Sequence, residues 1–280
     1  MLYGHTLPSN ISWATTGTFE TDVRLSNRQP GEQTVISGIA TSSPTIGEYV
    51  DITADWSVPQ GLGAVCLLNL SCPSGTRIEV TGRRLGDGDY NRPLGGNSES
   101  LVGALADGRK QAVILTDTSD SDYIGVRVRI YNDTGGVTWA DDTTDLYVGE
   151  IAPFATLDIP KVDARRETAR TIRRVKERAV NGAVHLAWRG EYRSFSLTVR
   201  GTVAEAHLGG LDGLDWDALR VMQDTPLYRA LVIPRIHGEN GQIDYALCNK
   251  TALFGVVEWG ATKNSLGQSV ECSLSVEEAL

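Results

Sequence analysis

Long hydrophobic runs are missing from this 280-residue sequence. No apolar stretch approaches the roughly 20 residues that a helix needs to span a bilayer. A secretory signal has a basic segment followed by an apolar block, and residues 1–5 do not begin such a pattern. We therefore expect a protein that is made in a cytoplasm and does not insert into a membrane. It can still reach the outside of a cell as part of a larger particle.

Cysteine and histidine are scarce, with four of each. The cysteines form no CxxC pair, and the apolar alternation of residues 270–276 places Cys272 on the core side of a strand, as a small hydrophobic residue. A shared metal or cluster site would need cysteines from both halves of the chain, and the sequence leaves open whether they meet. We expect no metal and no cofactor. The residues concerned are Cys66, Cys72, Cys248, Cys272, His5, His185, His207 and His237.

The common catalytic motifs are also absent from the sequence. There is no Gly-x-Ser-x-Gly elbow, no His-Glu-x-x-His and no phosphate-binding loop. Hydrolysis of a polysaccharide would need two carboxylates that converge in a cleft, but the acids are dispersed or sit in turns. The adjacent acids at 141–142 and 277–278 would point to opposite faces of a strand. We predict that the chain is not an enzyme.

Acidic residues outnumber basic ones by 35 to 26, which gives a formal net charge of −9 and a pI near 5.0. Such a surface repels phosphate backbones, so nucleic acid is not an expected partner. The hydrophobic fraction of 41% is that of a globular chain, and the length favours two domains. We place a first domain at 1–152, a linker or basic arm at 153–182 and a second domain at 183–280.

What the sequence does contain is β-strand patterning. In residues 125–131, apolar side chains at every second position alternate with polar ones, which predicts a half-buried strand. Residues 64–70 form a continuous apolar run, as expected of a strand covered on both faces. The second domain alternates in residues 192–199, and one helix is expected at 211–222 with Asp215 as its cap. The predicted fold class is mainly β, with an N-terminal jelly-roll sandwich and a smaller C-terminal β module that holds one short helix.

The order and spacing of the strands in the first half resemble those of the discoidin-like, galactose-binding jelly roll. The resemblance implies a β-sandwich that carries its ligands on the loops at one end. It is carried by residues 51–56, 64–70, 76–80, 123–130 and 146–151.

The second half is similar to the small β module of distal and minor tail proteins of long-tailed phages. That family builds rings at the tail end, where it joins the tail tube to the host-recognition apparatus. The resemblance implies a protein of the virion tail that forms a homo-oligomer, a hexameric ring by analogy, and contacts tail tube and tail hub proteins. The family has no catalytic residues to carry over. The resemblance rests on residues 188–197, 225–228, 245–247, 253–259 and 270–278.

Polar and aromatic residues that follow residue 82 form a candidate ligand site. Charged groups can make bidentate contacts to sugar hydroxyls, and an aromatic ring can lie under a pyranose. The Asp-Gly-Asp sequence at 87–89 superficially suggests calcium, but it lacks the other ligand positions of an EF-hand, so a plain turn is favoured. Trp139 either binds ligand or packs over the mouth of the barrel. The candidate ligand-binding residues are Arg83, Arg84, Asp87, Asp89, Tyr90 and Trp139.

A strongly basic segment lies between the two domains. Residues 165–178 hold seven cations and two acids, and their apolar spacing does not decide between a short polar helix and an extended β arm. The segment is either a solvated face or a clamp that pairs with acidic surface on a neighbouring copy or on the tail tube. In a ring, such a clamp would be a heterologous contact that closes by rotation. The candidate assembly residues are Arg165, Arg166, Arg170, Arg173, Arg174, Lys176 and Arg178.

The leading functional prediction is a structural component of a phage or phage-like tail tip, which forms a ring at the distal end of the tail tube and displays a jelly-roll domain. The alternative is a carbohydrate-binding adhesin module that recognises a glycan on the host surface. An enzyme acting on cell-wall polysaccharide is disfavoured, because the sequence shows no pair of converging acids.

Overall fold

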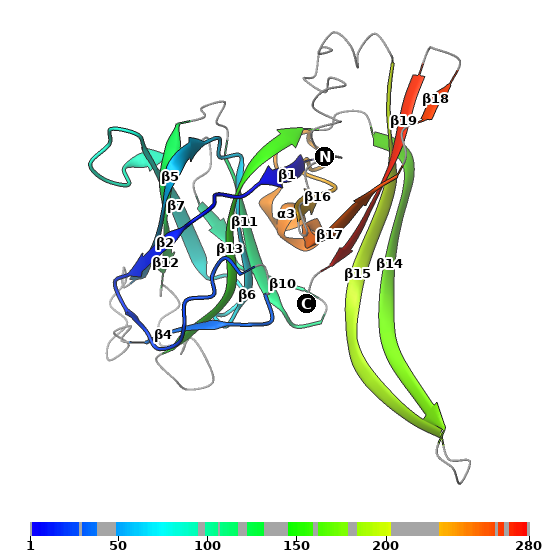
Figure 1. Ribbon diagram of the computed structural model, residues 1–280, viewed down its shortest axis with the longest axis horizontal. Coiled ribbons are helices and arrows are strands. Elements are labelled where there is room, and N and C mark those ends of the chain that lie inside the picture. Colours follow the sequence, from blue (N-terminus) through cyan, green and yellow to red (C-terminus); the bar gives the residue numbers. More distant parts are fainter. Residues whose placement is uncertain are drawn as a thin grey trace. The chain divides into compact units, whose positions relative to one another are not determined.

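The computed structural model places most of the described chain in β-strands (Figure 1). The chain falls into two compact units, each made of two separate stretches of sequence. We call them the sandwich unit, Leu2–Leu157 with Ile233–Ala252, and the hairpin unit, Asp158–Val232 with Leu253–Leu280. The structure describes residues 2–27, 30–37, 49–94, 99–105, 107–116, 122–131, 145–158, 162–178, 184–202, 230–260, 263–265 and 269–278.

The sandwich unit contains two sheets. The first has the strand order β10-β11-β6-β13-β1, with β4 also pairing β13 and β3 pairing β4, and the second has the order β2-β5-β12-β7-β8, with β9 also pairing β7. The strands of the first sheet are β1 (Leu2–Thr6), β3 (Thr18–Phe19), β4 (Thr34–Ser37), β6 (Ala64–Leu70), β10 (Gly103–Ala104), β11 (Lys110–Leu115) and β13 (Leu146–Asp158). Those of the second are β2 (Ser12–Thr15), β5 (Tyr49–Gln60), β7 (Arg77–Arg84), β8 (Arg92–Pro93), β9 (Glu99–Leu101) and β12 (Tyr123–Tyr131).

The chain crosses repeatedly from one sheet of the sandwich to the other. β5, β7 and β12 belong to the second sheet, whereas β6, β11 and β13 belong to the first. The long strands therefore pair with strands that do not adjoin them in sequence, such as β6 with β11 and β13, as in a jelly roll. Buried side chains from both sheets form one hydrophobic core between them. The predicted mainly β fold with an N-terminal sandwich is confirmed.

The alternation predicted for β12 is confirmed by its burial. Val126, Val128 and Ile130 are fully buried in the core, whereas Arg127 and Arg129 lie on the opposite face and are only partly buried. Antiparallel pairing with β5 on one side and β7 on the other fixes this register. A slip by one residue would turn the arginines into the core, so the apolar pattern specifies the pairing.

A third layer covers the other face of the first sheet, and it comes from far downstream in the sequence. We call Ile233–Ala252 the clip, and it contains the helix α3 (Tyr245–Thr251). The helix packs against β11, the neighbour of β6. Consistent with a covered sheet, Cys66 and Val113 are as fully buried as Val65, which faces the core. β6 is thus buried on both faces, as its continuous apolar run predicts.

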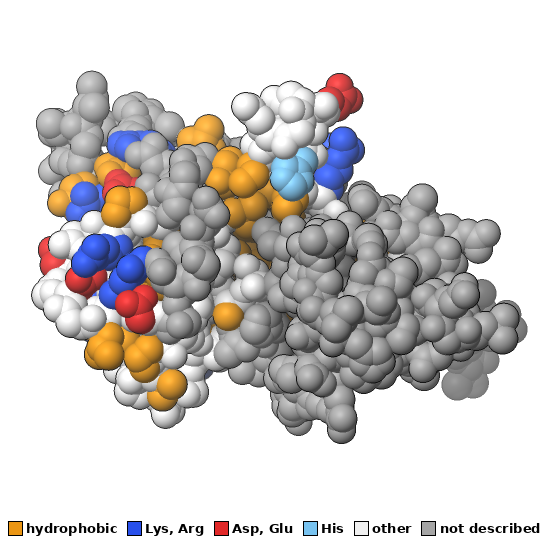
Figure 2. All heavy atoms as spheres, turned by 90° about the horizontal axis from the view of Figure 1, so that it is seen from above, with side chains coloured by type: hydrophobic (Ala, Val, Ile, Leu, Met, Phe, Trp, Pro, Cys, Tyr) orange, Lys and Arg blue, Asp and Glu red, His pale blue; other side chains and the backbone are white. Residues whose placement is uncertain are grey.

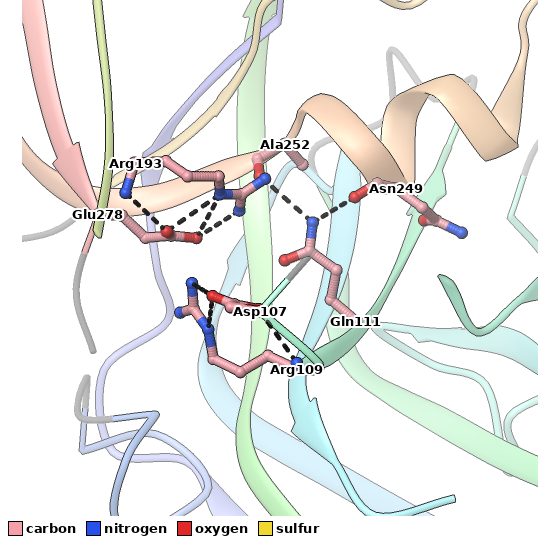
Figure 3. A network of polar contacts seen from close by, with 7 residues as sticks. All are labelled: Asp107, Arg109, Gln111, Arg193, Asn249, Ala252 and Glu278. Atoms are coloured by element: carbon pink, nitrogen blue, oxygen red, sulfur yellow. Dashed lines mark hydrogen bonds and ion pairs between the residues drawn. The ribbon is translucent and has the colours of Figure 1, made fainter. Parts of the chain in front are cut away.

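Two buried amides join the clip to the sandwich, and Figure 3 shows the contacts of one of them, Gln111. Gln111 donates to the backbone carbonyls of Asn249 and Ala252. The Asn249 side chain accepts from the backbone N–H of Val113 at 2.7 Å and donates to the carbonyl of Leu101 at 2.6 Å. Buried polar groups are costly unless they are hydrogen-bonded, and here each amide has partners. The clip is therefore an integral part of the sandwich unit.

The start of the helix α3 is stabilised by the residue directly before it, Asp244. The Asp244 carboxylate accepts a hydrogen bond from the backbone N–H of Leu247 at 2.9 Å, which caps the helix start. The helix predicted at 211–222 lies outside the described residues. α3 was not predicted as a helix, because residues 245–247 were assigned to a closing segment of the tail module.

The hairpin unit contains one antiparallel sheet with the strand order β16-β17-β19-β15-β14 and with β18 also pairing β19. Phe195 and Leu197 of β15 and Leu274 and Val276 of β19 are buried, as the alternation in the sequence predicts. Arg193 and Glu278 form a multidentate ion pair in the same sheet (Figure 3). The strands are β14 (Val162–Arg178), β15 (Val184–Thr202), β16 (Ala230–Ile233), β17 (Leu253–Trp259), β18 (Lys263–Ser265) and β19 (Ser269–Glu278).

The basic segment is an extended strand, and the helical alternative is wrong. Residues 165–178 lie within β14, which forms a long antiparallel hairpin with β15 (Figure 1). The register pairs Arg170 with Arg193 and Arg174 with Trp188. Pairing with β15, rather than any local preference, makes this segment extended.

The predicted domain limits, 1–152, 153–182 and 183–280, stay predictions, because compactness does not test which segments fold independently. No helix in the described ranges has the length and apolar character needed to cross a membrane. Cys66, Cys72 and Cys248 are buried, and none of these three is in a disulfide.

Candidate functional site

Polar side chains line the outer face of the second sheet, the face turned away from the core. Because β12 pairs with both β5 and β7, residues of the three strands lie side by side in rows. We call this surface the outer face. From one end of β12 to the other, its rows are Asp55–Gly125–Arg83, Thr53–Arg127–Thr81 and Asp51–Arg129–Glu79, and then the pair Tyr49–Tyr131.

The first row gathers two of the predicted ligand residues around Asp55. Arg83 binds one oxygen of the Asp55 carboxylate at 2.6 Å, and the hydroxyl of Tyr90 donates to the other oxygen at 2.6 Å. The Arg83 guanidinium carbon lies 5.2 Å from the centre of the Tyr90 ring, within cation–π range. Tyr90 follows β7 in a loop, yet its ring lies against Gly125 of the outer face.

Gly125 makes this arrangement possible. A Cβ atom at this position would collide with the Asp55 carboxylate and would lie 2.8 Å from the Ala54 carbonyl oxygen and 3.1 Å from the Tyr90 ring. The absence of a side chain therefore leaves the room in which Asp55 and Tyr90 meet. The sequence shows this glycine inside a strand pattern, which is a sign of close approach by other atoms.

Tyr90 is a hydrogen-bond donor over the whole physiological range. Burial, reinforced by the hydrogen bond to the Asp55 carboxylate, raises the pKa of Tyr90 to about 12. The phenol therefore stays protonated and holds Asp55, which leaves the ring and the Arg83 guanidinium as a preorganised pair. Such a pair offers the chemistry that sugar hydroxyls and a pyranose face require.

The rim of this site is a turn held by ion pairs. Arg92 binds both oxygens of the Asp87 carboxylate, at 2.8 and 2.9 Å, and the backbone N–H of Arg84 donates to the same group. These hydrogen bonds lower the pKa of Asp87 to about 2. Asp87 accepts hydrogen bonds from both Arg84 and Arg92, as a side chain that holds a turn does. The described residues contain no cluster of three metal-ligating side chains.

Arg84 lies at the end of the sandwich rather than in the Asp55 cluster. Its guanidinium carbon is 5.1 Å from the centre of the buried Tyr123 ring, and its Nε is 3.5 Å from Asp122. The backbone carbonyl of Tyr123 accepts a hydrogen bond from the Trp56 indole at 2.8 Å. Arg84 therefore caps a packed aromatic region.

The opposite end of the outer face carries a second aromatic group that the sequence analysis missed. The Tyr49 and Tyr131 rings meet edge to face, with their centres 6.0 Å apart. The guanidinium carbon of Arg77 lies 3.5 Å from the centre of the Tyr131 ring, and that of Arg129 lies 3.6 Å from the centre of the Tyr49 ring. Arg129 also binds Asp51 through two hydrogen bonds, which raise the pKa of Arg129. Tyr49 begins β5 and Tyr131 ends β12. In the sequence only Tyr131 has a basic residue close by, Arg129 two positions before it.

The structure thus brings together only part of the predicted ligand set. Arg83 and Tyr90 meet at Asp55, a residue the sequence analysis did not select. Asp89 is exposed and accepts a hydrogen bond from the backbone N–H of Tyr90 at 2.7 Å. Trp139 lies outside the described residues.

Acidic and basic side chains lie close together on the face of the molecule seen in Figure 2. Figure 2 shows blue and red side chains next to one another rather than in separate patches. This agrees with the ion pairs of Asp51 and Asp55 on the outer face and of Asp87 in the turn beside it, each with an arginine partner. The side chains of the basic strand β14 lie outside the described set, so its predicted assembly role stays a prediction.

No known family model matches the chain, and no curated protein matches it in sequence. Solved structures that are similar to parts of it include the following three. The chain has 12% identity to CpGH89CBM32-6 of Clostridium perfringens, with a TM-score of 0.32, over 54% of this chain and 98% of that one. It has 12% identity to CBM32-3 from a family 31 glycoside hydrolase of Clostridium perfringens, with a TM-score of 0.37, over 52% and 92%. It has 17% identity to the tail of an empty GTA particle with C6 symmetry, with a TM-score of 0.26, over 44% and 81%. These TM-scores are low, and the likenesses carry no argument about function.

Proposed function

We propose that this chain is a structural component of a phage or phage-like tail tip, which assembles into a ring through the hairpin unit and displays the sandwich unit. The observation that supports the proposal most directly is the edge of the hairpin sheet. β14 pairs with β15 on one side, and no described strand pairs with its other side. An edge strand of 17 residues offers backbone N–H and C=O groups to a strand of another chain.

The charge of this edge strand favours a second copy as the partner. Residues 165–178 hold seven cations and two acids, whereas the whole chain carries a net charge of −9. A neighbouring copy therefore offers acidic surface to a basic strand, which steers and orients the encounter. Cations on an edge strand also discourage unspecific pairing with apolar strands.

In this proposal the contact is heterologous and its rotation closes into a ring, hexameric by analogy with the tail family. The other partners are tail tube and tail hub proteins, and the location is the virion tail. We propose no catalytic role. The described carboxylates of the outer face are engaged by arginine and tyrosine side chains, which suits a rigid surface better than proton transfer.

The test is the oligomeric state of the full chain, measured by analytical ultracentrifugation and by electron microscopy of negatively stained particles over a range of protein and salt concentrations. We expect a closed ring with one subunit number, and rings that dissociate at high salt. The double charge reversal Arg170→Glu with Arg174→Glu should shift the assembly toward monomer. The matched control is Arg24→Glu with Arg235→Glu, which reverses two exposed charges of the sandwich unit.

A full chain that stays monomeric at every concentration and salt condition would count against the ring. Rings that tolerate both charge reversals equally would count against the β14 edge as the contact. The first result would contradict ring formation itself, and the second would contradict only the placement of the contact on β14.

A second candidate function is carbohydrate binding by the sandwich unit, and the cluster of Asp55, Arg83 and Tyr90 favours it. A fixed guanidinium beside a fixed phenol ring can hold a sugar with little loss of side-chain entropy on binding. The ligand in this case would be a glycan of the host surface, and the chain would serve as an adhesin.

Binding of the full chain to a glycan array tests this second function. We expect Tyr90→Ala to weaken binding about tenfold, as truncation of an aromatic contact commonly does. Tyr90→Phe should retain more of it, because the ring remains. Tyr192→Ala, in the hairpin unit, is the control, and Trp139→Ala tests the other predicted aromatic residue. If the wild-type chain binds no glycan, or binds equally after Tyr90→Ala, this function is contradicted.

A further inference from the structure

The middle row of the outer face contains an arginine whose charge is not matched. Arg127 lies between Thr53 of β5 and Thr81 of β7 and is partly buried. Within the described part of the chain, its side chain makes no hydrogen bond, ion pair or ring contact. A partly buried guanidinium with no counter-ion is a group that an incoming anion would stabilise.

The neighbouring acids are engaged elsewhere. Asp55 binds Arg83 and Tyr90, Asp51 binds Arg129 through two hydrogen bonds, and Glu79 accepts a hydrogen bond from Tyr131. None of them forms an ion pair with Arg127. Within β5, β7 and β12, the described arginines of this face outnumber the described acids by one, on a protein whose net charge is −9. Its cations are Arg77, Arg83, Arg127 and Arg129, and its acids are Asp51, Asp55 and Glu79.

A second and independent feature lies next to this arginine. Thr81 is 8% exposed, and its hydroxyl has no hydrogen-bond partner. A buried hydroxyl without a partner carries a free-energy cost, which a ligand could remove by accepting a hydrogen bond. Thr81 is the direct cross-strand partner of Arg127, so both groups face the same side of the sheet.

We infer that Arg127 and Thr81 form a binding site for the carboxylate of an acidic saccharide. The guanidinium would bind the carboxylate through two parallel hydrogen bonds, and the Thr81 hydroxyl would donate a third. The three carboxylates in the adjacent rows repel a doubly charged phosphate more than a singly charged carboxylate. The site therefore favours the anion with the smaller charge.

The row of Arg127 lies between two groups of aromatic side chains, and this position favours a saccharide as the carrier of the carboxylate. Tyr90 and Arg83 lie in the row on one side, and Tyr131 and Tyr49 lie two rows away on the other. An acidic residue within an oligosaccharide could rest on Arg127 while neighbouring sugar rings reach the aromatic groups. The inference rests on the proposed carbohydrate binding and adds to it the class of ligand.

The experiment uses the full chain and a panel of uronic and sialic acid oligosaccharides, each printed beside the same compound with its carboxyl group reduced to an alcohol. The variants are Arg127→Gln, which removes the charge, and Thr81→Val, which removes the hydroxyl and keeps the branched shape. Arg24→Gln is the matched control, because it removes an exposed arginine elsewhere in the same unit.

We expect the wild-type chain to prefer an acidic oligosaccharide to its reduced counterpart by at least about tenfold, the scale of a charge-assisted hydrogen bond. Arg127→Gln should abolish this preference, and Thr81→Val should reduce it without lowering the melting temperature. The control should behave as wild type.

Three results would overturn the inference. If the wild-type chain binds acidic and reduced compounds equally, the glycan function stands and the carboxylate site fails. If Arg127→Gln alters the oligomeric mass rather than saccharide preference, the occupant is an acidic side chain of another copy. If no saccharide of either kind binds, the carbohydrate function itself fails along with the site.

Discussion

The side-chain oxygen of Asn249 accepts a hydrogen bond from the backbone N–H of Val113 at 2.7 Å, across 136 positions of sequence. The same side chain donates to the carbonyl of Leu101. One amide of the clip thus replaces a hydrogen bond that β11 of the first sheet would otherwise make to water and one that β9 of the second sheet would make. The sandwich is complete only when the clip is in place.

Asn249→Ala should therefore lower the free energy of unfolding by about 1–3 kcal/mol, because it leaves the buried N–H of Val113 without this partner and removes the hydrogen bond to the part-buried carbonyl of Leu101. Urea unfolding of the full chain, followed by tryptophan fluorescence, measures the change. Asn240→Ala is the control, since Asn240 is an exposed residue of the same clip. A loss at Asn249 no greater than at Asn240 would show that the clip does not stabilise the sandwich.

Gly125→Ala should destabilise the sandwich unit by about 1–3 kcal/mol, the range for overpacking a filled site. The added Cβ would push against the Asp55 carboxylate and the Ala54 carbonyl. Thermal unfolding of the full chain measures the effect. Gly88→Ala serves as the control, because a Cβ at that position meets no atom within 4 Å. Equal melting temperatures for the two variants would be inconsistent with the crowded geometry around Asp55.

The acid titration of Asp87 should depend on Arg92. The Arg92 hydrogen bonds lower the pKa of Asp87 to about 2 from an ordinary value of 3.8, so the folded state favours the carboxylate. This contribution to stability is present above the ordinary value and is lost as the pH falls toward 2. In Arg92→Gln, NMR titration should show the pKa of Asp87 rising toward its ordinary value. An unchanged pKa would mean that the ion pair is absent in solution, and Arg24→Gln should leave Asp87 as it is.

The buried thiols should be inert in the folded chain. Burial raises the pKa of Cys72 to about 11, and burial together with the nearby charge of Asp244 raises that of Cys248 to about 12. In a Cys272→Ser background, an aromatic disulfide reagent at pH 8 should label no thiol of the native protein and three after denaturation. Rapid labelling of any thiol in the native state would show that the sandwich opens.

The sequence indicates the strands well where the signal is local. β12 alternates over consecutive residues, so Val126, Val128 and Ile130 identify the core side without any knowledge of the partners. The basic strand β14 has no such alternation, and only its register with β15 makes it extended. α3 has seven residues, too few for a helical period, although Asp244 is a recognisable cap.

The site was harder to predict, because its residues meet only through pairing. Arg83 and Tyr90 are close in sequence and were predicted together. Asp55 joins them because β5 and β7 flank the same strand. Arg127 looked like any outward arginine of an alternating strand, since only the three-dimensional structure shows that its neighbours leave it unmatched.

The position of the clip in the sequence determines when the sandwich can finish folding during translation. Residues 158–232 of the hairpin unit are synthesised before Ile233–Ala252 leaves the ribosome. A nascent chain that stops early therefore has β11 uncovered and Gln111 without its partners in the clip. We expect proteases to recognise such incomplete chains. A subunit with a finished sandwich must therefore already have had residues 158–232 of the hairpin unit synthesised.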